Sequence, residues 1–307
     1  MISVLLAYKI LQLFVYMILG FLLVKLKVIK SDDSMVLSKI ALWLLMPAAI
    51  INSFDVEVTN ELLSGILLAF CAAIIMHLLL IVIDFAFSRI FKGNCVERAS
   101  VMYSNAANLI IPIVSFALGD EWVIYSCAFM SVQLVFMWTH GVQLFTETKE
   151  VDLKKILLNV NIIAILAGFC LMIFGLRLPP FVKDISSSLS AMVGVVGMLI
   201  AGMLAAKIDF KQVVKNKRLY LVLVMRMIVC PVIMLVLLKT ALLLVDIKDA
   251  DKVLLIVYLA SITPSAATLM QFAQIYNKDS VFATAVNIFT TIICIATIPA
   301  FVWLYWL

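Results

Sequence analysis

Long apolar stretches separated by short polar connections follow one another along almost the entire chain. A helix that crosses the hydrocarbon core of a bilayer needs about 20 predominantly apolar residues. Ten stretches meet this length, at residues 5–24, 35–54, 61–87, 98–118, 122–145, 155–176, 185–206, 219–244, 253–276 and 281–305. The connections leave no room for a soluble domain between them. The pattern therefore predicts an all-α membrane protein with ten transmembrane helices.

Composition excludes a soluble domain and gives no sign of a cofactor. Of the 307 residues, 65% are hydrophobic and 13% are charged, whereas a soluble domain is about half apolar and about a quarter charged. The net charge of +5 does not indicate a nucleic-acid partner, because the basic residues lie in short connections between apolar stretches. The six cysteines show neither CxxC nor Cys/His metal spacing. Lys25 and Lys27 follow the first stretch, which lacks a small-residue cleavage pattern and is expected to remain as a helix.

Positive residues are distributed unevenly between alternate connections. The connections after the first, third, fifth, seventh and ninth stretches hold about 15 lysines and arginines, and the others hold about five. The positive-inside rule then predicts a multi-pass protein of the cell membrane with both termini outside the cytoplasm. Ten spans of this kind divide into two sets of five with opposite orientations, at residues 1–150 and 151–307. We therefore predict two inverted five-helix repeats.

The fourth helix of each predicted repeat carries polar residues and a proline in its middle. Asn105, Asn108 and Pro112 interrupt the first of these stretches. Thr263, Pro264 and Ser265 interrupt the second. Proline cannot donate the backbone hydrogen bond that continues a helix. In hydrocarbon, a freed backbone group is tolerated only where protein or a water-filled cavity satisfies it. Two such interruptions at matching positions predict broken helices 4 and 9 that form a transporter's binding site.

Amides, hydroxyls and the N-terminal ends of half-helices suit a carboxylate ligand, because those ends carry partial positive charge. We predict that the substrate-binding residues are Asn105, Asn108, Gln133, Thr263 and Ser265, with Pro112 and Pro264 as the helix breaks. The alternative is that the amides only join helices by hydrogen bonds, as polar residues do in membranes. Gln133, mid-way along the fifth stretch, is open to either interpretation. Gln271 and Asn287 are further candidates of the same kind.

Three of the ionisable residues within apolar stretches are candidates for a role at the site. Asp84 and Arg226 occupy the third helix of the first repeat and the third helix of the second, at comparable predicted depths. They can form an ion pair, or each side chain can extend to the interface. His77 lies seven residues before Asp84 and can either support proton movement or form a structural hydrogen bond. Together the three residues are candidates for support of the site or for a proton relay.

Several of these motifs resemble those of the auxin efflux carrier family. The matching features are Asn105 followed seven residues later by Pro112, residues 42–53 with Pro47, Gln133 with Trp138, Pro264 followed by Ala273, Tyr276 and Asp279, and residues 290–299. The resemblance covers nearly the whole chain, without a long central loop, and so is to a compact prokaryotic member. It implies a fold related to the bile-acid/anion transporter superfamily, with helices 4 and 9 crossed. It also implies a scaffold of helices 1, 2, 6 and 7, against which helices 3–5 and 8–10 move in an elevator-like way.

These observations predict a transporter of a small organic anion and not an enzyme. The chain contains no GxSxG, HExxH or GxGD motif. One alternative is a Na⁺- or H⁺-coupled symporter of an organic solute with the same crossed helices, and a second is a membrane sensor without transport. One departure from the family concerns the site: Ala107 and Ile110 stand where relatives often have glycine, and Asn108 adds an amide. The expected partners are the substrate and the bilayer, and a homodimer is left open.

Overall fold

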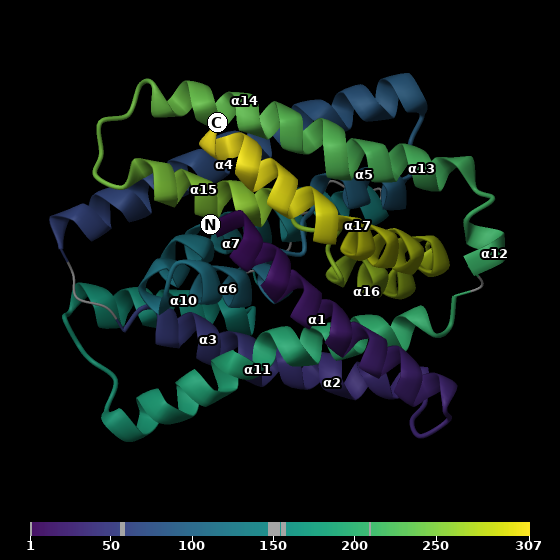
Figure 1. Ribbon diagram of the computed structural model, residues 1–307, viewed down its shortest axis with the longest axis horizontal. Coiled ribbons are helices and arrows are strands. Elements are labelled where there is room, and N and C mark those ends of the chain that lie inside the picture. Colours follow the sequence, from purple (N-terminus) through teal and green to yellow (C-terminus); the bar gives the residue numbers. More distant parts are fainter. Residues whose placement is uncertain (1, 56–58, 147–153, 155–157, 209) are drawn as a thin grey trace.

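A computed structural model describes residues 2–55, 59–146, 154, 158–208 and 210–307 (Figure 1). In these residues the α-helices are α1 (Ile2–Lys25), α2 (Ser34–Ile40), α3 (Met46–Ser53), α4 (Asn60–Phe91), α5 (Cys95–Met102), α6 (Ala106–Ala117), α7 (Val123–Phe136), α8 (Val142–Thr146), α10 (Val160–Ile173), α11 (Pro180–Ala205), α12 (Phe210–Val213), α13 (Lys217–Val224), α14 (Cys230–Leu242), α15 (Ala250–Ile262), α16 (Thr268–Ile275) and α17 (Ser280–Trp306). Short 3₁₀ turns are η1 (Ser31–Asp33) and η3 (Asp120–Trp122), and π-helical turns are η2 (Ala41–Leu45), η4 (Met137–Gly141) and η5 (Met225–Val229).

The prediction of an all-helical membrane protein is confirmed for the described part of the chain. Six helical rods there are long and apolar enough to span a bilayer: Ser31–Ser53, Asn60–Phe91, Val123–Thr146, Pro180–Ala205, Lys217–Leu242 and Ser280–Trp306. Shorter apolar helices, Leu11–Lys25 and Val160–Ile173, occupy the first and sixth predicted stretches. The fourth predicted stretch is divided between α5 and α6, and the ninth between α15 and α16.

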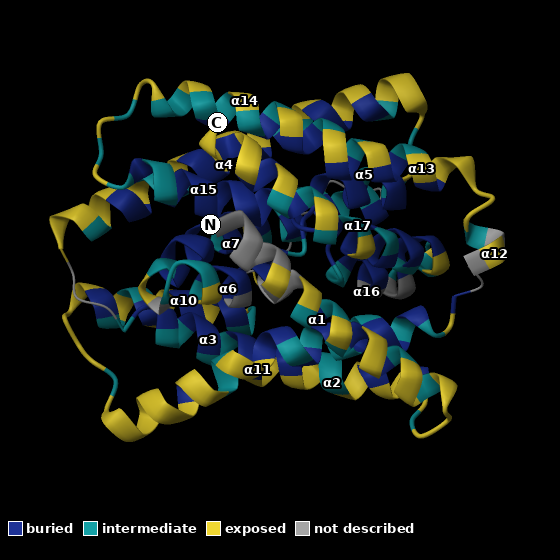
Figure 2. Ribbon diagram, in the orientation of Figure 1, coloured by how far each residue is buried: buried dark blue, intermediate teal, exposed yellow. Residues whose placement is uncertain are grey.

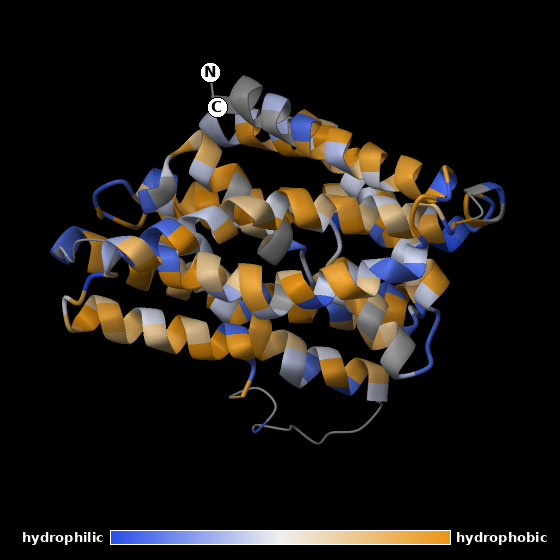
Figure 3. Cartoon of the chain, turned by 90° about the horizontal axis from the view of Figure 1, so that it is seen from below, coloured by the Kyte–Doolittle hydropathy of each residue, from blue (hydrophilic) through white to orange (hydrophobic). Residues whose placement is uncertain are grey.

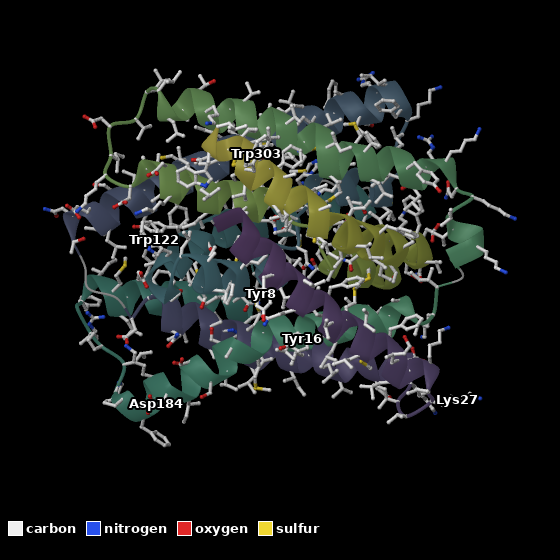
Figure 4. The ribbon with its side chains drawn as sticks, viewed as in Figure 1. Tyr8, Tyr16, Lys27, Trp122, Asp184 and Trp303 are labelled. Atoms are coloured by element: carbon white, nitrogen blue, oxygen red, sulfur yellow. The ribbon has the colours of Figure 1, made fainter. Side chains whose placement is uncertain are left out.

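Polar residues gather at the two ends of the rods, where the connections lie. Figure 3 shows hydrophobic colouring along the helices and hydrophilic colouring in the connections. Several helices begin with a side-chain cap: Thr59 accepts from Leu62 N at the start of α4, and Asp279 accepts from Phe282 N at the start of α17. These caps satisfy backbone donors that have no partner within the helix. Figure 4 places Lys27 toward one end of the molecule and Trp122 and Asp184 toward the other.

Apolar side chains also cover much of the outside, as expected for a protein in lipid. On α4 the exposed positions include Leu67, Cys71, Ile74, Leu78, Val82 and Phe85, which recur every three or four residues. This spacing is one stripe along a helix. Figure 2 shows similar exposed faces on the outer sides of α11 and α14. In water, an apolar surface of this extent would favour aggregation, so the stripes are consistent with contact with lipid tails.

The helices form two groups that pack mainly within themselves. One group, called here the α11 group, consists of α1, α2, α3, α10 and α11. The other, called the crossing group, consists of α4 to α8 and α13 to α17. The groups meet where α1 and α11 both contact α17 and α6, and where α3 and α10 contact α7. This boundary runs through the interior of the molecule and leaves space for a cavity.

Two glycines allow α1 and α11 to touch along their backbones. A Cβ atom at Gly20 would lie 2.3 Å from Leu199 O, and a Cβ atom at Gly202 would lie 1.9 Å from Met17 O. Both distances are far shorter than atomic contact permits, and the obstacle is backbone that cannot rotate away. Small residues at a helix–helix interface are a common way to gain close packing in a membrane.

We therefore predict that Gly202→Ala destabilises the protein. Overpacking of this kind costs about 1–3 kcal/mol, and the backbone obstacle places this substitution near the upper end. At about 2–4 °C per kcal/mol, the melting temperature in detergent should fall by roughly 5–10 °C. Ala191→Val on the exposed face of the same helix is the matched control and should change it little. Equal melting temperatures for both variants would contradict the close packing.

Candidate functional site

The interruptions in the fourth and ninth stretches meet each other in space. Between α5 and α6 the backbone is non-helical at residues 103–105, and between α15 and α16 at residues 263–267. An isolated antiparallel bridge joins Ser104 to Ser265. Asn105 N donates to Pro264 O at 2.7 Å, and Ala266 N donates to Tyr103 O at 3.0 Å. We call these two segments the crossing. Their backbone groups satisfy one another, which removes the cost of unpaired groups in an apolar interior.

Side chains from neighbouring helices hold each half of the crossing. Gln133 on α7 accepts from Ser104 N at 3.1 Å through Oε1 and donates to Ser104 O at 2.9 Å through Nε2. On α17, Thr290 Oγ1 accepts from Ser265 N at 3.1 Å, and Asn287 Nδ2 donates to Ser265 O at 2.6 Å. One amide on α7 thus binds both the backbone N–H and the carbonyl of Ser104. On α17, a hydroxyl and an amide together bind the same two backbone groups of Ser265. Gln133 has a positioning role at the crossing, whatever else it contacts.

Arg226 is buried against the crossing. Its side chain is 1% exposed. Its guanidinium donates to the carbonyl oxygens of Val101, Met102, Ser261 and Thr263, at distances from 2.6 to 3.4 Å. These carbonyls belong to the C-terminal ends of α5 and α15. The side chain reaches from the π-helical turn η5 to the backbone of the crossing.

The partner of Asp84 is Arg98 on α5, so the possible pair with Arg226 is not formed. Arg98 Nε donates to Asp84 Oδ1 at 2.9 Å, and Arg98 Nη2 donates to Oδ2 at 2.6 Å. His140 Nε2 lies 3.4 Å from the same carboxylate. His140 Nδ1 lies 3.0 Å from the hydroxyl of Tyr103, the first residue of the crossing. A continuous polar chain therefore leads from Arg98 through Asp84 and His140 to the crossing.

His77 lies in a largely apolar environment. Its ring is fully buried, and Nδ1 lies 2.7 Å from Ala73 O one turn earlier in α4. The ring lies 4.9 Å from that of Phe129 and 5.2 Å from that of Phe136, between centroids. Nε2 is also buried and has no hydrogen-bond partner among the described residues, so both the structural role and the proton-relay role of this histidine stay predictions.

Proline accounts for one interruption only. Pro264 lies within the crossing, and its carbonyl is a partner of Asn105. Pro112 lies inside α6, seven residues after the crossing, so the prediction that it breaks the helix is wrong. The interruption between α5 and α6 is stabilised by hydrogen bonds that Ala266 and Gln133 donate. The sequence pattern does not reveal these partners. The side chains of Asn108, Pro112 and Gln271 lie outside the part of the chain that the structure describes.

A cavity of about 390 Å³ lies between the α11 group and the crossing group, within the usual range of about 300–1,000 Å³ for ligand pockets. It extends from Ser104 and Asn105 to the exposed residues Asp32 and Lys207. Its described polar lining is mostly neutral: Ser34, Ser38, Ser104, Asn105, Gln133, Asn161, Thr268, Ser280, Thr284, Asn287 and Thr291. Six methionines form much of the apolar lining: Met35, Met46, Met130, Met137, Met198 and Met270. Methionine adapts its shape to irregular ligands.

Some of the predicted binding residues line this cavity, and others do not. Asn105 and Gln133 line it. Thr263 and Ser265 are absent from its described lining, because both are buried in the crossing and their backbones bind Arg226, Thr290 and Asn287. Ser265 therefore positions the site instead of facing a ligand in this conformation. Both residues still contribute, because they determine where α16 begins.

Sequence reasoning missed Asn161, which the structure places in the cavity wall at the start of α10. Its side chain is 3% exposed, and Oδ1 has no hydrogen-bond partner. A buried polar atom without a partner is costly unless a ligand or water satisfies it. The available signal was a second asparagine two residues after Asn159, which caps α10. Both asparagines lie within the sixth predicted apolar stretch, residues 155–176, and only the tertiary structure separates the cap from the cavity residue.

A comparison with known protein families matches most of the chain. Residues 5–152 and 144–302 match the model of a family described as membrane transport protein. The chain belongs to the auxin efflux carrier family. Its membership of a transporter family bears out the resemblance seen in the sequence and places this multi-pass protein among transporters. Curated proteins include no significant match to the chain.

The ion pair beside the crossing gives a quantitative prediction for this family member. Removing either Asp84 or Arg98 leaves the other charge uncompensated, so the double variant Asp84→Asn with Arg98→Gln should lose less stability than the sum of the single variants. We expect a coupling energy of about 1–3 kcal/mol. A double-mutant cycle on unfolding in detergent measures it. Arg177 contacts Asp55 in a distant connection, so Asp84→Asn with Arg177→Gln is the additive control. Additivity in both cycles would contradict the pair.

Proposed function

We propose that this chain transports a small organic anion, of the carboxylate class, across the cell membrane. The observation that carries the proposal is the cavity that reaches the crossing from one surface only. Its described lining contains no residue of the connections at the opposite end. A cavity closed at one end is what one conformation of an alternating-access transporter requires. A sensor without transport would have no need for two interrupted helices at the bottom of such a cavity.

Recognition in this proposal rests on neutral donors and helix starts. α6 begins directly after Asn105 and α16 begins at Thr268, and both residues line the cavity. The N-terminal end of a helix carries unpaired N–H groups and partial positive charge, which favour an anion. Lys207 is the cation of the described lining, and it pairs with Asp32 at the outer edge. Lys207 would attract an anion to the opening, while amides and hydroxyls would hold it.

Two features support an inverted repeat of five helices, residues 1–150 and 151–307. Each half contains one interrupted helix, and the two interruptions bridge at Ser104 and Ser265. The helix that follows each interruption in the chain provides the polar clamp, which is Gln133 in the first half and Asn287 with Thr290 in the second. The same relation between consecutive elements in both halves is what a duplicated and inverted unit would produce.

The division into two packing groups supports an elevator-like movement. The crossing and both of its clamps belong to the crossing group, so they can move as one body without loss of their hydrogen bonds. The α11 group, with its backbone contact between α1 and α11, would remain fixed as the scaffold. The cavity lies on the boundary between the groups, where such a movement would change access from one side of the membrane to the other.

We infer the orientation of the protein in the membrane from the charges at the two ends of the molecule. The connections after α1, α4 and α11 gather at one end of the molecule, and those after α3, α10 and α14 gather at the other (Figure 1). The first set carries most of the lysines and arginines and contains Lys207 at the cavity opening. The positive-inside rule assigns that end to the cytoplasm. This conformation would therefore be open to the cytoplasm, with both termini outside.

We predict that Asn105→Ala weakens binding of a carboxylate by roughly ten- to a hundredfold. A hydrogen bond to a charged group contributes about 1.5–3 kcal/mol, and about 1.4 kcal/mol corresponds to a factor of ten. Asn161→Asp tests the charge preference, because it keeps the side-chain size and adds a negative charge to the cavity wall. It should weaken binding more than Asn161→Ala does. Thr240→Ala on an exposed helix face is the control.

The measurements are ligand affinity and uptake into proteoliposomes, over a series of mono- and dicarboxylates. Melting temperature is recorded in parallel, so that loss of binding is separated from loss of folding. Unchanged affinity in folded Asn105→Ala and Asn161→Asp would move the site away from the cavity. Binding without uptake of any tested solute would favour a sensor.

A labelling experiment tests the orientation. In a variant without native cysteines, Asp184→Cys should react with an impermeant thiol reagent added to intact cells, and Lys215→Cys should react only after the cells are opened. Both residues are exposed, and they lie at ends of the molecule assigned to opposite sides: Asp184 is in the first turns of α11, and Lys215 is in the connection before α13. The reverse pattern would invert the topology and assign the cavity opening to the outside.

A further inference from the structure

The environment of Arg226 consists of backbone carbonyl groups. The guanidinium makes five contacts with four carbonyl oxygens, of which the shortest are 2.6 Å to Ser261 O and 2.7 Å to Thr263 O. Arginine has five N–H donors and no acceptor, so its guanidinium needs oxygen acceptors around it. Carbonyl oxygens supply such acceptors, and they are the type of ligand that a cation requires. We call this set of oxygens the carbonyl cage.

The cage exists because two helices end at the same place. The last carbonyls of a helix have no partner within it and carry partial negative charge. α5 ends at Met102 and α15 ends at Ile262, and the bridge between Ser104 and Ser265 holds these ends together. Without a cation, oxygen atoms of like partial charge would converge in a water-poor interior. A cation at this point is therefore a condition for forming the crossing.

The described residues place no carboxylate beside Arg226 to balance its charge. Asp84 is bound by Arg98 at 2.6 Å, and Glu97 lies 3.7 Å from Arg218. Within this described part of the chain, the countercharge is that of the two helix ends. A buried arginine without an acid is unusual, because isolated buried charges carry a large desolvation cost. Multiple carbonyl contacts offset that cost and replace the hydration that the guanidinium has lost.

We propose that Arg226 is a built-in cation of the crossing, and that its guanidinium occupies a cage that would otherwise take an exchangeable cation. Oxygen ligands of this kind suit small metal ions as well as guanidinium. Arg226 is a positioning residue, because it acts by holding the ends of α5 and α15 so that α6 and α16 begin in the cavity. The wild-type crossing consequently needs no bound Na⁺ to form. The consequence for transport rests on the function proposed above, and the consequence for assembly does not.

The decisive test replaces the side chain and supplies the cation from solution. Arg226→Ala should lower the melting temperature in detergent by roughly 10 °C, as expected for loss of a buried charge from its partners. Millimolar methylguanidinium, or Na⁺ at constant ionic strength, should restore at least half of this loss. Gly202→Ala is the matched control, because it destabilises the protein by overpacking and leaves the cage occupied. It should gain nothing from either cation.

A second pair of variants separates charge from shape. Arg226→Lys keeps a positive charge in the cage, whereas Arg226→Met keeps similar length and removes the charge. We expect the lysine variant to lose less than half of the melting temperature that the methionine variant loses. Equal losses, or an Arg226→Ala variant that neither cation stabilises, would overturn the proposal.

Wild-type protein provides the test that does not depend on any variant folding. Its melting temperature should be the same in sodium chloride and in choline chloride, and a Na⁺-specific increase would overturn the proposal. Uptake of a carboxylate into proteoliposomes should likewise keep its rate when choline replaces Na⁺. A Na⁺-dependent rate would overturn the inference and leave the proposed transport standing. Absence of uptake in both media would count against the proposed transport and leave the cage to be decided by the melting experiments.

Discussion

The structure depends on satisfying the backbone of two helices that stop in the middle of the molecule. In an apolar interior each unpaired backbone group is costly, and two interrupted helices expose many of them at once. Their extended residues pair with each other, as Asn105 N does with Pro264 O. The carbonyls that remain at the ends of α5 and α15 bind Arg226. The side chain of Gln133 forms hydrogen bonds with the backbone of Ser104, and those of Asn287 and Thr290 form hydrogen bonds with the backbone of Ser265.

This arrangement gives the crossing two chemically different sides. On one side the helices end, their carbonyls converge, and a buried cation is bound. On the other side helices begin, and Asn105 and Thr268 line a cavity with neutral donors and methionines. The polarity of the backbone thus places the cation Arg226 at the helix ends and the candidate anion site at the helix starts. In each half these two points are only a few residues apart along the chain.

Local changes in helix winding position the charged groups around the crossing. Two of the three π-helical turns in the described residues contain a key side chain, with His140 in η4 and Arg226 in η5. The third, η2, precedes α3 and contributes Ala41 to the cavity wall. A π-helical turn widens the helix by one residue and rotates the side chains beyond it, and such turns often occur at functional sites. The turn at Arg226 changes the direction of a side chain for which the sequence indicated only a depth comparable to that of Asp84.

The sequence by itself determined the class of molecule, its apolar helices and the two places where helices stop, because length, hydropathy and polar residues in hydrocarbon are local properties. It also marked Asn105 and Gln133, since an amide within an apolar stretch is conspicuous wherever it lies. Only the tertiary structure decided that Pro112 continues a helix, that Asp84 pairs with Arg98, and that Arg226 binds carbonyls. The same holds for Asn161, whose place in the cavity wall depends on residues from other helices. These outcomes depend on which groups become neighbours across the fold, and hydrophobic pattern carries no record of partners distant in the chain.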